Sequence, residues 1–191
     1  RLGFGEGAGP APRVRPVAAA PEAPAPAQDM PFGPYETVTT LDALRGWIAR
    51  ARDAGVIGLD TETTGLDALK VGLVGISLAV APGQACYIPL RHEGSGDLMG
   101  SAAPVQIDFA AAMAELKPLL EDPAVLKVLH NAKYDLEVLC RAENGGIAVA
   151  PVDDSMMISY AMEAGRHGHG MDELSSCLLY TSDAADDLLC V

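Results

Sequence analysis

Two acidic residues, Asp60 and Glu62, stand two positions apart at the end of a short apolar run. The run VIGLD, residues 56–60, follows a glycine and is typical of a buried strand. Because side chains alternate across a strand, Asp60 and Glu62 leave the same face of the sheet. Two carboxylates so close repel each other unless a cation lies between them, and such hard oxygen ligands suit Mg²⁺ or Mn²⁺. Acidic residues are also common at exposed strand ends, so the pair needs support from a second element.

That second element is the segment LKVLHNAKYDLEVL, residues 126–139. The run before His130 predicts a strand, and the residues after it predict a helix on which Asn131 and Asp135, four apart, lie on one side. Asp135 is therefore the third candidate metal ligand, with stabilisation of the helix dipole as the alternative. Tyr134 fits either a binding site or the core. For His130 we expect a structural role in preference to metal ligation.

Two further polar groups favour structural interpretations. His167 and His169 lie in the glycine-rich segment GRHGHGMDEL with no acidic or cysteine partner at ligand spacing, so we expect them to serve a loop. Asp153 and Asp154 begin a predicted helix, where an aspartate caps the free backbone N–H groups. Neither pair is expected to carry the chemistry.

The elements that position these residues follow from hydrophobic spacing and from turn residues. Thr39 and Thr40 offer a cap for a helix that ends at Gly55, and the turn APG separates two strands of an antiparallel hairpin at 71–80 and 84–90. Further helices are predicted at 108–122 and 132–144, a strand at 125–130, and a strand or turn leading into a helix at 151–165. The predicted fold class is α/β, with a mixed sheet of an antiparallel meander plus parallel strands, flanked by helices.

Composition limits the possible functions. A chain of 191 residues with 49% hydrophobic residues suits one domain, and it has neither an apolar run long enough for a membrane span nor a signal sequence, so we expect a cytoplasmic protein. The formal net charge of -13 argues against a domain that binds nucleic acid through a basic surface. An acidic chain still suits an enzyme whose carboxylates bind divalent cations.

The two ends of the sequence differ from its centre. Residues 1–32 are dominated by Ala, Pro and Gly and are expected to form an interdomain linker. Residues 177–191, CLLYTSDAADDLLCV, resemble a translated sequencing-adapter sequence, so we expect them to be a non-native tail. The predicted domain therefore covers residues 33–176.

Three segments carry a resemblance to a known family. GLDTETTGL, LHNAKYDLEVL and DDSMMISYAMEAGRHGHGMDEL together resemble, in order and spacing, the 3′-5′ exonuclease (proofreading) domain of bacterial DNA polymerase I. The similarity covers about residues 35–176 and implies a ribonuclease H-like fold with two divalent metal ions, Mg²⁺ or Mn²⁺. By this resemblance Asp60 would bridge the ions, Glu62 would bind one and orient the attacking water, and Asp135 would hold the second through water.

The resemblance also implies a substrate. Thr63, Leu66, Asn131 and Tyr134 would match the residues that grip the terminal nucleotides of a single-stranded DNA 3′ end. A primer-template would be reached through the polymerase domain, and we expect a monomer with no membrane partner. The family's third motif, a Tyr and an Asp four residues apart, is absent, and the polymerase domain is missing. We therefore expect weak or no activity from the chain as given.

Two other interpretations remain open. A ribonuclease D-like enzyme that trims RNA 3′ ends shares the paired acidic residues and the Asn-to-Asp element, although the flanking residues favour polymerase I. A catalytically inactive scaffold of the same fold is the second alternative. Retention of Asp60, Glu62 and Asp135 counts against the inactive scaffold.

Overall fold

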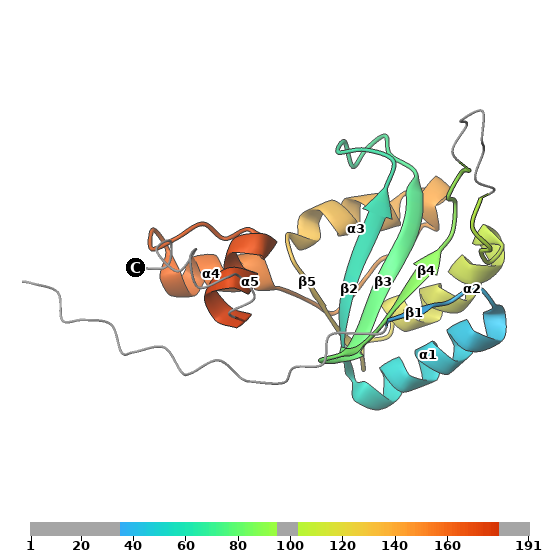
Figure 1. Ribbon diagram of the computed structural model, residues 1–191, viewed down its shortest axis with the longest axis horizontal. Coiled ribbons are helices and arrows are strands. Elements are labelled where there is room, and N and C mark those ends of the chain that lie inside the picture. Colours follow the sequence, from blue (N-terminus) through green and yellow to red (C-terminus); the bar gives the residue numbers. More distant parts are fainter. Residues whose placement is uncertain (1–34, 95–102, 180–191) are drawn as a thin grey trace, which may run out of the picture.

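The computed structural model describes residues 35–94 and 103–179, which form one mixed six-stranded sheet with helices around it (Figure 1). The strand order is β1-β4-β3-β2-β5-β6. Strands β2, β3 and β4 form the antiparallel meander, while β5 and β6 run parallel to β2, and β1 runs parallel to β4. The α/β sheet predicted from the sequence is confirmed. The strands are β1 (Glu36–Thr37), β2 (Val56–Thr63), β3 (Leu73–Ala81), β4 (Gln84–Pro89), β5 (Leu126–Leu129) and β6 (Val152–Asp154).

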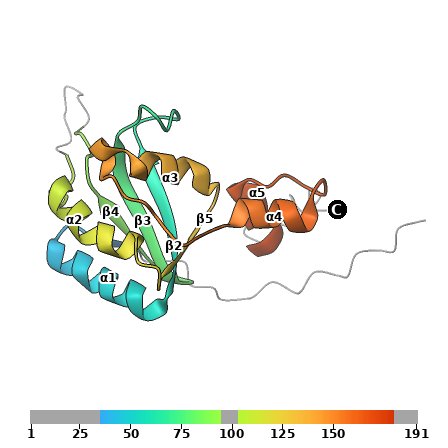
Figure 2. The same cartoon turned by 180° about the vertical axis from the view of Figure 1, so that it is seen from behind.

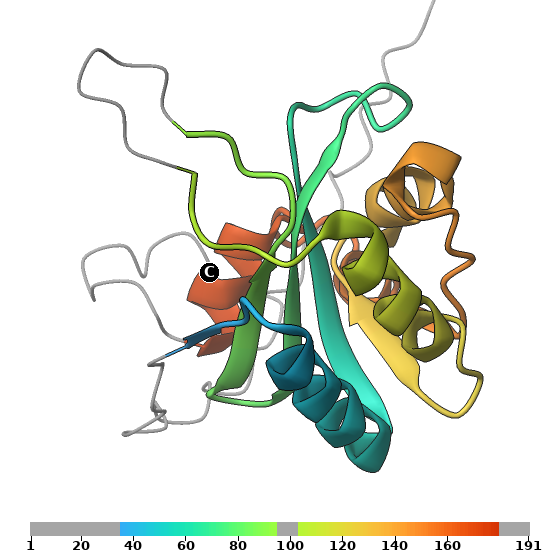
Figure 3. The same ribbon diagram turned by 90° about the vertical axis from the view of Figure 1, so that its right-hand side faces the viewer.

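Three helices cover one face of the sheet, as Figures 2 and 3 show from behind and from the side. They are α1 (Leu41–Ala54), α2 (Phe109–Leu120) and α3 (Ala132–Cys140), the last followed by the short 3₁₀ helix η1 (Ala142–Asn144). The remaining helices, α4 (Ser155–Glu163) and α5 (Met171–Leu179), project from the β6 end of the sheet (Figure 1). Helix α4 has no buried side chain. None of the helices in the described ranges is long and apolar enough to span a bilayer.

Helix α1 shows how local sequence determines where a helix begins and ends and which of its faces packs on the sheet. Thr40 accepts a hydrogen bond from the backbone N–H of Ala43 and begins the helix, and Gly55 ends it in the left-handed region at φ 69°. One apolar face of the helix points into the core, where it meets β2 and β3. The buried residues of α1 are Leu44, Trp47, Ile48 and Ala51.

The structure differs from the predicted elements in three places. Strand β2 continues to Thr63, three residues beyond the predicted run. The helix predicted over 132–144 ends at Cys140, because the buried Asn144 side chain accepts a hydrogen bond from Leu73 N–H and donates to the carbonyls of Val71 and Val138. Helix α5 also runs across the predicted domain end at Ser176. The predicted linker and most of the predicted tail, residues 180–191, lie outside the described residues.

A fully buried lysine connects the turn before β5 to the segment that leads into β6. Lys127 of β5 donates from Nζ to the carbonyl oxygens of Asp122, Val125 and Ala150, at 2.9, 2.7 and 2.6 Å. Three backbone acceptors thus replace the water that an ammonium group would otherwise bind. The contact holds the turn before β5 against the segment that leads into β6.

Candidate active site

Asp60 and Glu62 lie on the face of the sheet that α1, α2 and α3 leave uncovered. Along β2 they alternate with the buried residues Leu59 and Thr61, and both are exposed. In the antiparallel register Asp60 pairs with Ser77, and Glu62 pairs with Gly75. The two carboxylates therefore project from one face at the carboxyl end of β2, as the alternation of side chains requires.

Asp135 reaches the same strand from α3. Its side chain is 3% exposed, and Oδ1 accepts hydrogen bonds from the backbone N–H of Thr61 at 3.1 Å and from its hydroxyl at 2.6 Å. The ladder between β2 and β5 ends at Gly58, so beyond that pair the edge of β2 has no strand partner. The Asp135 carboxylate takes the place of a strand partner there, because it accepts the hydrogen bond of the Thr61 backbone N–H. Asp135 thereby holds Thr61, the residue between Asp60 and Glu62, in place.

The electrostatics of these carboxylates are unfavourable in the absence of a cation. Although the Asp60 side chain is exposed, partial desolvation of its carboxylate against the sheet raises its pKa, and the Thr61 backbone N–H and the nearby His130 offset only part of the rise. Burial also raises the pKa of Asp135; the Thr61 hydroxyl lowers it, and the negative charge of Asp60 raises it further. Within residues 35–94 and 103–179, no three His, Cys, Asp or Glu side chains are gathered closely enough to enclose an ion.

The raised pKa of Asp60 predicts that this residue destabilises the fold near neutral pH. The folded chain binds the proton more tightly than the unfolded chain, whose pKa is about 3.9. The free energy of unfolding therefore falls as pH rises from that value through the folded pKa, and it stays lower above it. We expect Asp60→Asn to raise the thermal midpoint by a few degrees at pH 7 in EDTA. We expect no change at pH 3.

Circular dichroism melts across this pH range provide the measurement. Asp53→Asn, at an exposed carboxylate near the end of α1, is the matched control and should leave the midpoint unchanged. A lower midpoint for Asp60→Asn at pH 7 would contradict the destabilising role.

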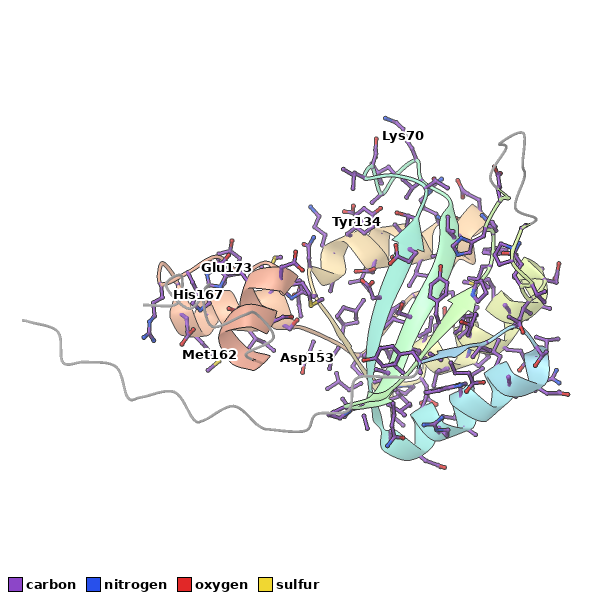
Figure 4. All side chains as sticks on the ribbon, viewed as in Figure 1. Lys70, Tyr134, Asp153, Met162, His167 and Glu173 are labelled. Atoms are coloured by element: carbon purple, nitrogen blue, oxygen red, sulfur yellow. The ribbon has the colours of Figure 1, made fainter. Side chains whose placement is uncertain are left out.

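The predicted substrate residues Thr63, Leu66 and Tyr134 meet at the loop between β2 and β3. The Tyr134 hydroxyl lies 2.6 Å from Thr63 Oγ1, and both hydroxyls are within hydrogen-bond distance of the Gly65 carbonyl, at 2.7 and 2.8 Å. Figure 4 shows Tyr134 on α3 below the loop that carries Lys70. Leu66 is 97% exposed on this loop. Tyr134 and Thr63 thus fasten the loop from which Leu66 projects.

Asn131 does not share a helix side with Asp135, contrary to the spacing argument. It precedes α3 in the left-handed region, at φ 61°, and its side chain is exposed and makes no capping bond. The Asp154 carboxylate accepts the backbone N–H groups of Asn131 and Ala132, at 3.1 and 2.9 Å. The same carboxylate caps α4, as predicted, by accepting from Met156 N–H at 2.9 Å. Asp154 therefore joins the start of α3 to the start of α4.

The uncovered face also contains a cavity of about 250 Å³ between the sheet and the start of α4 and α5. His130 borders it. Its Nδ1 lies 3.0 Å from Ser155 Oγ, while its Nε2 is buried and has no hydrogen-bond partner in the described part of the chain. The structural role predicted for His130 accounts for one ring nitrogen and leaves the other unused. Other residues that line the cavity include Gly58, Asp60, Ser77, Ala79, Ala85 and Val128.

Comparison with known proteins shows the family of this chain. Residues 35–186 match the 3′-5′ exonuclease family. The chain belongs to this family. DNA polymerase I of Rhizobium leguminosarum is 46% identical over 156 residues, which cover 76% of this chain and 15% of that protein. The exonuclease chain thus spans about 15% of the length of this relative.

Two solved structures share the fold of this chain. Escherichia coli RNase D, described as an exoribonuclease involved in structured RNA processing, has a TM-score of 0.53 and 26% identity, covering 81% of this chain and 35% of that one. Brucella melitensis NrnC with bound Mg²⁺ has a TM-score of 0.54 and 24% identity, covering 80% and 63%. The predicted ribonuclease H-like 3′-5′ exonuclease fold is confirmed. The family match extends ten residues past Ser176, into the segment expected to be a non-native tail.

The histidines of the connection between α4 and α5 contact residues of the same helical pair. His167 Nε2 lies 2.7 Å from a Glu163 carboxylate oxygen, and the buried His169 lies 2.7 Å from Ser159 Oγ through Nδ1. Figure 4 shows His167 and Glu173 within this helical pair. These contacts agree with the structural role predicted for the loop.

Sequence reasoning treated Tyr87 as a strand residue and missed its place near Glu62. Its ring lies over Gly75, where an added Cβ would come 2.0 Å from the Tyr87 hydroxyl oxygen. That oxygen lies 2.6 Å from His92 Nε2, and burial, followed by the charge of Glu62, raises the pKa of Tyr87. Strand alternation from Gln84 was the available signal, because it places Tyr87 on the uncovered face with Ser77.

Proposed function

We propose that this chain is the proofreading part of a bacterial DNA polymerase I, and that the complete domain hydrolyses single-stranded DNA from its 3′ end to nucleoside monophosphates with two divalent ions. The observation that carries the proposal is the pair of hydrogen bonds from Thr61 to Asp135, because they fasten the second motif to the first between Asp60 and Glu62. The identity with the Rhizobium polymerase supports the assignment to DNA.

The residues at this strand end fit divalent cations. Asp60 and Glu62 offer hard oxygen ligands on an open face, and the mutual repulsion of Asp60 and Asp135 is the kind that bound cations relieve. The structure of NrnC with bound Mg²⁺ supports the same choice of ion. Asp60 would bridge the two ions, Glu62 would hold one of them, and Asp135 would hold the other through water.

The ions would supply an activated water and stabilise the leaving 3′ oxygen. Glu62 would orient that water by accepting a hydrogen bond from it. Asp135 keeps β2 in place through Thr61, so the two carboxylates of β2 hold their separation. The buried Thr61 hydroxyl leaves Asp135 Oδ1 no freedom to turn away.

The surroundings of β2 provide contacts for the terminal nucleotides. The exposed Leu66 side chain would wedge against a base, and the ring of Tyr134 and the exposed Asn131 would contact its neighbour. Such contacts tolerate any base, so sequence-independent action is expected. Lys70 and Lys133 are exposed on the adjoining loop and helix and would attract the phosphates despite the acidic chain.

A chimera tests the substrate class. Residues 35–176 would be joined to the sequence that follows the matching position in the Rhizobium polymerase, because none of the five tyrosines here is followed by Asp four residues later. With Mn²⁺ we expect monophosphate release from a 3′-labelled DNA oligonucleotide to exceed release from the same RNA sequence about tenfold or more. EDTA should stop both. The chimera carrying Glu62→Gln is the control, because it reveals any hydrolysis that comes from the Rhizobium part alone.

The likeness to E. coli RNase D favours RNA 3′ ends as the second candidate. Faster release from RNA than from DNA would select it and would reject the proofreading role. Release of dinucleotides in place of monophosphates would contradict both candidates.

A further inference from the structure

Tyr87 occupies the position that faces Glu62 on the neighbouring strand. Glu62 of β2 pairs with Gly75 of β3, which has no side chain to place beside the carboxylate. A Cβ added at Gly75 would lie 2.0 Å from the Tyr87 hydroxyl oxygen and 2.4 Å from the ring carbon that bears it. Directly opposed Cβ atoms of an antiparallel pair stand about 4.5 to 5.5 Å apart. The hydroxyl of Tyr87 therefore lies where a side chain opposite Glu62 would begin, within reach of its carboxylate.

The strand register explains how a residue of β4 reaches this position. Tyr87 pairs with Ser77, which in turn pairs with Asp60, so all three side chains leave the uncovered face. The ring leans diagonally from this row into the next one, where Gly75 leaves the space open, and diagonal neighbours lie within reach of an aromatic side chain. The charge of Glu62 reaches the hydroxyl, because it is the second cause, after burial, of the raised pKa of Tyr87.

His92 holds the Tyr87 hydroxyl from the other side. Its Nε2 lies 2.6 Å from the hydroxyl oxygen, and the two rings meet edge to face with their centroids 5.7 Å apart. The Gln106 side chain holds the backbone of His92, because it accepts the N–H at 2.9 Å and donates to the carbonyl at 3.1 Å. The histidine is therefore anchored by a residue 14 positions later in the chain.

The Tyr87 hydroxyl can serve Glu62 with only one arrangement of protons. A carboxylate only accepts hydrogen bonds, so the hydroxyl must donate to Glu62, and its oxygen is left to accept from His92. This arrangement requires the His92 tautomer that carries its proton on Nε2. Carboxylates that bind metal ions are commonly held by such outer hydrogen bonds, and loss of the outer partner typically weakens metal binding about 10- to 100-fold.

We propose that Tyr87 is a positioning residue, whose hydroxyl accepts from His92 Nε2–H, donates to the Glu62 carboxylate and holds it in the orientation that binds a divalent ion. The inference rests on the proposed role of Glu62 as a metal ligand. Strand β4 thereby contributes to the candidate site. Asp135 holds β2 from one edge, and Tyr87 holds a carboxylate of the same strand from the other.

The tautomer of His92 is the first test, and it needs neither metal nor activity. In the full chain with ¹⁵N-labelled histidine, in mildly alkaline solution where the ring is neutral, we expect Nε2 of His92 to carry the proton. His92→Gln identifies the signals by their loss. Glu62→Ala should shift the population toward protonation on Nδ1, because the freed hydroxyl can then donate to Nε2. Asp53→Ala, at an exposed carboxylate of α1, is the matched control and should leave the tautomer unchanged.

Mn²⁺ binding by the full chain tests the consequence for Glu62, with the loss of the free-ion signal in electron paramagnetic resonance as the measurement. Tyr87→Phe keeps the ring over Gly75 and removes only the hydroxyl, so we expect the affinity to fall about tenfold. In a Glu62→Gln background the same change should cost less than about twofold, because the hydroxyl then has no charged ligand to orient. Tyr35→Phe, at an exposed tyrosine, is the matched control and should leave the affinity unchanged.

A second variant guards against a folding defect in the first. His92→Leu keeps the tyrosine but removes the donor to its oxygen, and it should weaken Mn²⁺ binding less than Tyr87→Phe does, again only where Glu62 is present. Circular dichroism would establish that each variant is folded.

The outcomes separate this inference from the proposed function. Mn²⁺ that binds in an Asp60-dependent way with equal affinity before and after Tyr87→Phe overturns the role of Tyr87 and leaves the carboxylate site standing. A His92 ring protonated on Nδ1 in the unsubstituted chain also overturns the hydrogen bond to Glu62, whatever the metal data show. Absence of any Asp60-dependent Mn²⁺ binding overturns both the inference and the proposed use of metal.

Discussion

Asp60→Ala in the chimera is expected to reduce the release of nucleoside monophosphates from single-stranded DNA by a factor of about 10² to 10³ or more. Asp60 is the proposed bridging ligand, and loss of one preorganised catalytic group costs about this much in rate. Its side chain is exposed on the uncovered face of β2, so the fold should survive the change. A 3′-labelled oligonucleotide with Mg²⁺ or Mn²⁺ provides the assay, and EDTA provides the metal-free baseline.

The chain without the extension from the Rhizobium polymerase should release monophosphates at least about 10² more slowly than the chimera, because it too lacks a catalytic group. It retains Asp60, Glu62 and Asp135 but has no Tyr-to-Asp pair at a spacing of four. The exposed residue Asp53 of α1, changed to Asn in the chimera, is the control and should leave the rate within twofold. Undiminished release by Asp60→Ala, or release that persists in EDTA, rejects the two-metal mechanism.

Lys127→Met is expected to lower the free energy of unfolding by about 3 kcal/mol. Methionine fills the space but leaves the carbonyls of Asp122, Val125 and Ala150 without their donor. Each buried acceptor left unpaired costs roughly 1 to 3 kcal/mol, and water reaches some of them. Urea unfolding provides the measurement, followed by the fluorescence of Trp47, the sole tryptophan of the chain.

Lys133→Met separates this effect from a general response to the loss of a positive charge. Lys133 is an exposed lysine of α3, with its side chain 82% exposed, and its replacement should change the free energy of unfolding by less than about 0.5 kcal/mol. Equal effects of the two substitutions would show that the three carbonyl contacts of Lys127 contribute nothing.

Local chemistry allowed much of the fold to be predicted. The cap at Thr40 and the left-handed Gly55 are properties of neighbouring residues, so both ends of α1 could be read from the sequence. The alternation along β2 likewise predicts that Asp60 and Glu62 share a face. These predictions depend on residues a few positions apart, where a short pattern contains the necessary information.

The contacts that complete the candidate site depend on distant residues and could not be read in this way. Asp135 is held by Thr61, 74 positions earlier, so no local pattern indicates that it satisfies a strand edge. The spacing of Asn131 and Asp135 assumed a continuous helix, whereas the Asp154 carboxylate holds Asn131 outside α3. The unused nitrogen of His130 likewise follows from Ser155, which belongs to another element.

The close packing of Tyr87 on Gly75 has a consequence for how this sequence can change over evolutionary time. Any side chain at position 75 would collide with the tyrosine ring, since even a Cβ would come 2.0 Å from its oxygen. We therefore expect the two positions to change together, because a lineage that acquires alanine at 75 must either displace the tyrosine ring at 87 or exchange it for a shorter residue. In homologous genomes we expect the combination of a larger residue at 75 with tyrosine at 87 to be missing, whatever the overall divergence.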